Sequence, residues 1–335
     1  MKNINLIPIA IFTLIFTFCG SGKNQGSNDN STAESTTKHS ITVPVFNQDS
    51  AYSFVKRQVD FGPRVPNTKA HNQCLEYLQE KLKSYGAEVI IQKGKGTLYN
   101  NQSIDIKNIV GSFNPTATHR VLLAAHWDSR PYADQDQDPS KHKTPILGAN
   151  DGASGVGVLL EIARHLSKMP QNIGIDIVFF DVEDYGQPAF HKDRYSEDGG
   201  WCIGSKYWAQ NPHIADYKAN YGILLDMVGA PSAKFYKEQY SMQYAKGVVD
   251  KVWQKAIESG FEGYFINQRG GYIIDDHLPV NEVCKIPMID IVHYDPNTDS
   301  GFNRHWHTVK DDMNNVDRNT LYAVGQTVMN VIFEY

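Results

Sequence analysis

The chain has 335 residues, of which 41% are apolar and 21% are charged, and its formal net charge is −5. This is the composition of a globular protein long enough for one large α/β domain or two small ones. The mild acidic excess gives no electrostatic basis for binding nucleic acid, so no nucleic-acid partner is expected.

The first residues predict export from the cell. Met1-Lys2-Asn3 precedes an apolar run over residues 4–18, which ends at Cys19. A basic start and a short apolar run are typical of a signal peptide, here residues 1–19, and are too short for a membrane span. Cys19 suggests a bacterial lipoprotein, lipidated at that cysteine and anchored to a membrane in the periplasm. An ordinary signal peptide is the alternative, because Phe18 is larger than the residue usual before a lipidated cysteine.

Polar residues dominate the segment that follows the leader. Residues 20–40 are rich in Ser, Thr, Asn, Gly and Lys, which predicts a disordered tether. Residues 41–335 are expected to form a single domain.

The three remaining cysteines are widely spaced, at Cys74, Cys202 and Cys284. They lack the paired spacing of a thiolate zinc site. We expect buried free thiols, with one disulfide as the alternative. Any metal ion must then be held by His, Asp and Glu.

Apolar spacing predicts alternating helices and strands along the domain. The expected helices cover residues 48–59, 70–84, a segment around 156–163, 204–209, 240–259 and 319–333. The expected strands cover residues 87–92, 106–113, 120–126, 173–181, 220–229 and 287–293. Strands that alternate with helices predict an α/β fold, a three-layer sandwich with a central mixed, mostly parallel sheet between helices. Ligands of such sheets bind at the carboxyl ends of the strands.

Acidic and imidazole side chains lie at the ends of these predicted strands or in the loops that follow them. They are His126, Asp151, Glu183, Asp184, Asp226 and His307. Taken singly, each has an ordinary explanation; Asp151, for example, could cap the helix that follows it. Together, carboxylates at one sheet edge would repel one another without a cation. Imidazole and carboxylate ligands without a thiolate suit Zn²⁺ in an open catalytic site, so we expect Asp151 to face a metal ion.

The adjacent pair Glu183-Asp184 fits a division of labour. One carboxylate can bind the metal while the other stays free to move protons. A free carboxylate beside other acids has a raised proton affinity, which suits a general base that later acts as an acid.

Other chemistries fit less well. The small-residue segment 148–157, GANDGASGVG, lacks the Lys-Ser/Thr of a phosphate-binding loop and the order of a dinucleotide-binding loop. No GxSxG segment is present. Residues 134–138, DQDQD, lack the glycine and distant Glu of a calcium loop, and we expect a surface loop there.

Six motifs in this order resemble a known superfamily. They are HWDS, GANDGASGVGVLLEIAR, FFDVEDYG, LLDMVGA, DDHLP and HWHTVKDDMNNVD. This set is similar to the zinc exopeptidases and, within them, to bacterial members of the animal-type glutaminyl-peptide cyclotransferases. The resemblance runs from about Phe54 to the C-terminus.

The resemblance implies an activity and a set of site residues. The activity is conversion of the N-terminal glutamine of peptides and proteins to pyroglutamate, with release of ammonia. One Zn²⁺ per chain would be held by Asp151, Asp184 and His307. Glu183 would be the general base and acid. The further residues implied are Asp226 and Asp276, in an acidic network near the substrate, and Trp306 and Trp201, in the pocket wall.

A two-zinc aminopeptidase is the alternative within the same superfamily. There His126 and Asp226 would hold a second zinc, Asp151 would bridge the two ions, and Glu183 would activate water. All these ligand types are present, so the ligands do not separate the two activities. The DDHLP segment and Trp306 favour the cyclase. A non-catalytic, metal-stabilised binding lipoprotein is a third hypothesis, but it leaves Glu183 without a role.

Overall fold

The computed structural model describes residues 42–168, 172–192 and 200–334. The expected signal peptide, Cys19 and the expected tether lie outside the described residues. The described residues belong to one compact unit. Within them, no helix combines the length and the apolar character that crossing a membrane requires.

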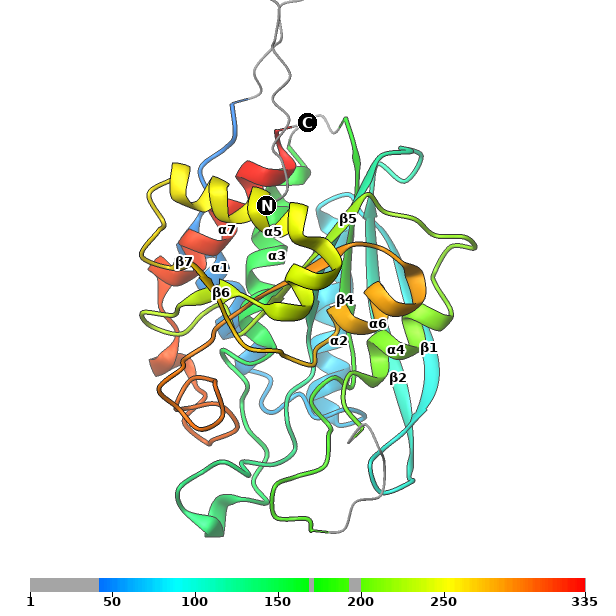
Figure 1. The fold of residues 1–335 in the computed structure, drawn as a ribbon. Coiled ribbons are helices and arrows are strands. Elements are labelled where there is room, and N and C mark those ends of the chain that lie inside the picture. The colour runs from blue at the N-terminus through cyan, green and yellow to red at the C-terminus, as the bar shows by residue number, and fades with distance from the viewer. Residues whose placement is uncertain (1–41, 169–171, 193–199, 335) are drawn as a thin grey trace, which may run out of the picture. The chain divides into compact units, whose positions relative to one another are not determined.

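A six-stranded sheet forms the centre of this unit, in the order β1-β2-β4-β3-β5-β8 (Figure 1). Four neighbouring strands, β4, β3, β5 and β8, run parallel, and β2 and β1 continue the sheet antiparallel. The strands are β1 Glu88–Thr97, β2 Ser103–Phe113, β3 Arg120–His126, β4 Gly174–Phe180, β5 Tyr221–Asp226 and β8 Met288–Val292. The predicted mixed, mostly parallel sheet is confirmed.

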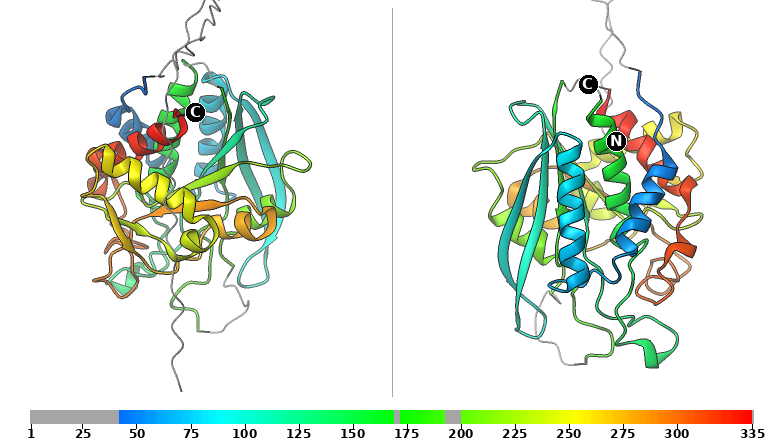
Figure 2. Two further views of the ribbon diagram at one scale, coloured as in Figure 1. Left: turned by 45° about the horizontal axis from the view of Figure 1, so that its top comes forward. Right: turned by 180° about the vertical axis from the view of Figure 1, so that it is seen from behind.

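Helices cover both faces of the sheet (Figure 2). The larger core cluster lies on one face and includes side chains of α1, α2, α3, α5 and α7. Helix α4 packs on the other face. The helices are α1 Gln48–Val59, α2 Lys69–Ser84, α3 Ala153–Leu166, α4 Ile203–Gln210, α5 Gln239–Glu258, α6 His277–Pro279 and α7 Arg318–Ile332. Each helix and strand expected from the sequence is present, with ends shifted by a few residues.

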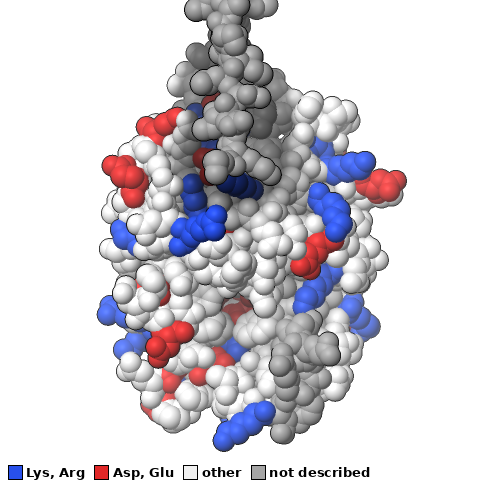
Figure 3. Space-filling view, viewed as in Figure 1, with Lys and Arg blue, Asp and Glu red and all other residues white. Residues whose placement is uncertain are grey.

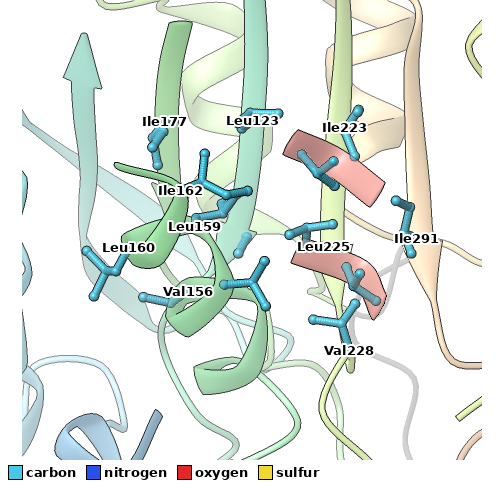
Figure 4. Close-up of a cluster of buried hydrophobic side chains, with 14 of the residues drawn as sticks. Leu123, Val156, Leu159, Leu160, Ile162, Ile177, Ile223, Leu225, Val228 and Ile291 are labelled. Atoms are coloured by element: carbon cyan, nitrogen blue, oxygen red, sulfur yellow. The ribbon is translucent and has the colours of Figure 1, made fainter. Parts of the chain in front are cut away.

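Helix α3 is the element most deeply buried against the sheet. Its Leu159 and Ile162 lie among side chains of β3, β4 and β5, such as Leu123, Ile177 and Leu225 (Figure 4). These side chains are fully shielded from solvent because the strands alternate their side chains between two covered faces. The apolar packing fixes the position of the loop that precedes α3.

Small residues allow α3 to approach the strand ends. A Cβ atom on Gly155 would lie 2.2 Å from the carbonyl oxygen of Leu225. Gly152 has φ +94°, a conformation that suits glycine, and it is the N-cap of α3 without any side-chain capping bond. Asp151 is therefore not the helix cap, and its carboxylate is free to face the site.

Several short elements were not expected from the sequence. Strands β6 (Phe235–Lys237) and β7 (Phe265–Arg269) form a separate two-stranded parallel sheet. A single turn with π-helical hydrogen bonds, Val280–Cys284, follows α6. Elements of three to five residues carry too little periodicity to be recognised.

Candidate active site

The side chains expected at the strand ends come together at one edge of the sheet. His126 is the last residue of β3, and Asp226 is the last residue of β5. Glu183 and Asp184 follow β4, and Asp151 precedes α3. His307 joins them from the loop between β8 and α7, which completes the group.

Asp151, Asp184 and His307 form the first candidate metal set, and all three are buried. His307 Nε2 lies 3.1 Å from Asp184 Oδ1 and 3.6 Å from Asp151 Oδ2. Asp151 Oδ2 and Asp184 Oδ2 are buried without a hydrogen-bond partner among the described residues. Two buried carboxylate oxygens without a partner, beside an imidazole, are costly, and carboxylate and imidazole are ligands of zinc, so these residues fit a zinc ion.

His126, Asp151 and Asp226 form a second candidate set, which shares Asp151 with the first. His126 Nε2 lies 3.0 Å from Asp151 Oδ1 and 3.1 Å from Asp226 Oδ1. Burial alone would lower the pKa of His126, but hydrogen bonds with Asp128, Asp151 and Asp226 outweigh it and raise the pKa well above its ordinary value. His126 thus lies between Asp151 and Asp226, within hydrogen-bond distance of both carboxylates.

The free carboxylates of the site have raised proton affinity. Burial, followed by the charges of Asp184 and Asp275, raises the pKa of Glu183 well above its ordinary value. Burial also raises the pKa of Asp226 to about 7. Glu183 Oε2 lies 4.0 Å from His126 Nδ1, outside hydrogen-bond distance. The environment of Glu183 therefore favours its protonated form more than water does, which suits a group that takes up and releases a proton.

A cavity of about 360 Å³ opens onto these carboxylates. The indole of Trp306 stacks on the His307 ring with 3.6 Å between centroids, and the Trp201 ring lies 5.9 Å from it at an 11° interplanar angle. Both tryptophans line the cavity, as expected from the sequence. Tyr272 and Ile274 line it as well, although their side chains are mostly exposed.

Of the adjacent acidic residues Asp275 and Asp276, the structure places Asp275 in the cavity lining, whereas the sequence resemblance implied Asp276. The Asp276 side chain is fully buried and is absent from the cavity lining, whereas Asp275 is part of it. The charge of Asp275 raises the pKa of Asp226 after the larger effect of burial. The structure thus places Asp275 at the cavity and Asp276 behind it, and no hydrogen bond joins Asp226 to Asp276 among the described residues.

One supporting residue lies in the segment expected to be a surface loop. Asp134 is 5% exposed, and its Oδ1 lies 3.6 Å from His307 Nδ1, so the surface-loop expectation is wrong for this residue. Arg130 donates to both Asp134 oxygens at 2.7 and 2.8 Å and lies 3.3 Å from Asp184 Oδ1. The four-residue spacing of Arg130 and Asp134 permits their ion pair, but no feature of the sequence connects this pair to His307.

Two more carboxylates hold the backbone of the candidate ligands. Asp128 accepts the backbone N–H groups of Glu183 and Asp184 at 3.1 and 3.2 Å. Asp311 does the same for Asn150 and Asp151 at 2.8 and 3.0 Å. Asp128 and Asp311 belong to motifs recognised in the sequence, HWDS and HWHTVKDD. Only the structure shows that they position the backbone next to the candidate ligands.

Comparison with known proteins places this geometry in a family. Residues 108–332 match the model of peptidase family M28. The chain belongs to this family.

Solved structures of high similarity cover nearly the whole domain. A glutaminyl cyclase from Tannerella forsythia is 56% identical, with a TM-score of 0.84, over 87% of this chain and 99% of that one. A protein from Parabacteroides distasonis described as a Zn-dependent exopeptidase is 55% identical, with a TM-score of 0.86 and the same coverage. A protein from Bacteroides thetaiotaomicron described as a leucine aminopeptidase precursor is 50% identical, with a TM-score of 0.84, over 88% of this chain and 99% of that one. The zinc exopeptidase-like fold is thereby confirmed.

Proposed function

We infer that this M28 protein is a zinc-dependent glutaminyl-peptide cyclotransferase, which converts N-terminal glutamine to pyroglutamate and releases ammonia. The observation that carries this inference is the contrast between the two candidate metal sets. Asp151 and Asp184 leave buried oxygens unpaired, whereas His126 already lies between Asp151 and Asp226. A single metal ion suits cyclisation, which needs no activated water. The similarity to the Tannerella forsythia cyclase supports the same reading.

Glu183 is placed to move the proton that the reaction transfers. A new bond forms between the substrate's α-nitrogen and the carbonyl carbon (Cδ) of its side-chain amide, and the bond from that carbon to the amide nitrogen breaks. Glu183 accepts the proton lost by the α-amine and returns it to the departing ammonia, so the peptide loses one NH₃ in total. The raised pKa of Glu183 suits both steps. A zinc ion bound by Asp151, Asp184 and His307 would polarise the γ-carbonyl as a Lewis acid.

The remaining residues orient the substrate and limit access of water. Asp226 and Asp275 line the cavity and offer acceptors for the amine and amide hydrogens of the glutamine. Trp201 and Trp306 supply flat apolar walls against which a curled side chain can pack. Because nucleophile and electrophile belong to one residue, holding this conformation supplies much of the rate enhancement.

Product analysis by mass spectrometry tests the activity directly. Purified protein is incubated with a peptide that begins Gln-Phe, and a peptide that begins Ala-Phe serves as the control. Loss of one ammonia from the first peptide, with the second unchanged, is the expected result. Release of free glutamine or alanine would instead identify an aminopeptidase.

We also propose that the enzyme works outside the cytoplasm as a membrane-anchored lipoprotein. The support is the leader sequence with Cys19 at its end. The substrates would then be exported peptides and proteins with an N-terminal glutamine. Labelling with a radioactive fatty acid should mark the wild-type protein and not Cys19→Ser; equal labelling of both would refute the anchor.

A further inference from the structure

The Glu183 carboxylate has one hydrogen-bond donor among the described side chains, and that donor is a thiol. Cys202 Sγ lies 3.4 Å from Glu183 Oε1. The other oxygen, Oε2, stays on the side of His126 at 4.0 Å from its Nδ1. The Glu183 side chain is 12% exposed, toward the cavity. One oxygen is thus held and the other is left for the substrate.

The surroundings of Cys202 keep the sulfur protonated and therefore able to donate. The residue is 1% exposed. Burial, followed by the charges of Glu183, Asp276 and Asp275, raises the pKa of the Cys202 thiol well above its ordinary value. A neutral thiol is a weak donor, so it can orient a carboxylate while lowering its basicity less than a hydroxyl or a cation would.

Backbone hydrogen bonds hold Glu183 and Cys202 next to each other. Cys202 N–H donates to the Glu183 carbonyl, and Ile203 N–H donates to the Val182 carbonyl, both at 3.0 Å. Val182 and Cys202 both adopt left-handed conformations, with φ of 54° and 55°. Such conformations cost free energy in residues other than glycine and persist where the surrounding structure imposes them. One of these two residues, Cys202, is the donor of the contact, and the other, Val182, directly precedes Glu183.

We propose that Cys202 is a positioning residue whose thiol fixes the carboxylate of Glu183 for proton transfer. This inference rests on the proposed cyclase activity. Cys202 does not touch the substrate; it acts through Glu183. Without the thiol, the carboxylate can rotate away from the substrate's amine, and displacement of a catalytic group by about 1 Å can reduce the rate up to a hundredfold.

Steady-state kinetics of three variants provide the first test. Cys202→Ala should lower kcat for Gln-Phe peptides by at least about tenfold and leave KM within about twofold, because positioning of Glu183 affects the reaction more than binding. Cys202→Ser should restore most of the lost kcat, because its hydroxyl also donates. Cys284→Ala is the matched control: its thiol donates to the Ala209 carbonyl at 3.4 Å, near the other end of α4, and its loss should leave kcat unchanged.

The infrared S–H stretching band provides a second test that needs no turnover. The difference spectrum of wild type minus Cys202→Ala isolates the band of this thiol. Glu183→Ala should shift that band, since it removes the acceptor, whereas a thiol that only fills space would keep its frequency.

Two results would overturn the inference: wild-type kcat in Cys202→Ala, or a band unaffected by Glu183→Ala. A loss of kcat that Cys202→Ser fails to restore would also count against it. If the wild-type protein releases no ammonia from Gln peptides, the proposed function fails instead, and the infrared result still decides whether the thiol binds Glu183.

Discussion

Asp134 Oδ1 lies 3.6 Å from Nδ1 of His307, while Nε2 of the same ring faces Asp184 at 3.1 Å. Arg130 holds Asp134 through two hydrogen bonds. The Asp134 carboxylate, which Arg130 holds in place, therefore lies on the Nδ1 side of the His307 ring, opposite Asp184. At 3.6 Å the contact is longer than a hydrogen bond, so Asp134 acts on Nδ1 through its charge, which favours a proton on Nδ1 and leaves Nε2 to bind a metal ion.

Asp134→Asn should weaken zinc binding by about 10- to 100-fold, as loss of such partners typically does. Competition with a chelator of known affinity measures the change. Asp138→Asn, at an exposed position of the same segment, is the control and should bind zinc like wild type. Equal affinities of the Asp134 and Asp138 variants would show that Asp134 does not support His307.

Asp151 and Asp226 variants should separate the two candidate metal sets. Asp151→Ala removes the residue common to both sets and should lose bound zinc, as measured by elemental analysis. Asp226→Asn affects the second set alone and should keep one zinc per chain. Two zinc ions per wild-type chain, with one lost in Asp226→Asn, would favour the aminopeptidase reading.

Glu183→Gln should retain zinc and lose nearly all turnover. Loss of a general base typically costs about 10²- to 10⁴-fold in rate, and glutamine cannot carry the proton. Zinc content and ammonia release are measured on the same preparation. Unchanged turnover would refute the role of Glu183.

The cavity rim predicts a preference for an apolar second residue in the substrate. Tyr272 and Ile274 line the cavity, and their side chains are 65% and 68% exposed, so apolar area remains to be buried there. Tyr272→Ala and Ile274→Ala should lower kcat/KM for Gln-Phe peptides roughly three- to tenfold and change it little for Gln-Gly peptides. Ile257→Ala, an exposed apolar position outside the cavity lining, is the control. Equal effects on both peptides would contradict the preference.

The acid stability of the protein should depend on a buried ion pair near the amino ends of β3 and β4. Arg120 donates to both oxygens of Asp176 at 2.7 Å, and Tyr217 donates to one of them at 2.7 Å. Burial alone would raise the pKa of Asp176, but hydrogen bonds from Arg120, Ser112 and Tyr217 outweigh it and hold the pKa below its ordinary value of 3.8. The carboxylate therefore stabilises the fold above that value, and this stabilisation is lost as the pH falls through the lowered pKa.

Asp176→Asn should reduce the free energy of unfolding at neutral pH by about 3–5 kcal/mol, because Arg120 is left buried without its partner. The difference from wild type should shrink as the pH falls below about 4. Denaturant unfolding at several pH values measures it. Asp105→Asn, which breaks the exposed pair with Lys95, is the control and should change stability little at any pH. A pH-independent difference for Asp176→Asn would contradict the linkage.

The sequence predicted the sheet and most site residues because both follow from simple rules. Buried strands show as apolar runs, and the residues after them, such as Asp226, lie at the ligand-binding edge. Such rules could not predict whether Asp275 or Asp276 lines the cavity. The two residues are adjacent, and the direction of each side chain depends on the turn into α6. Asp134 was missed because its neighbours are polar, and only the folded chain brings it to His307.

Asp311 binds the backbone of Asn150 and Asp151 from near the C-terminal end of the chain. His307 lies in the same late segment. A polypeptide emerging from the ribosome thus contains all six strands of the sheet before it contains His307 and Asp311. The first candidate metal set is therefore complete only after the last strand, so a chain that ends before His307 should contain every strand of the sheet and bind zinc poorly.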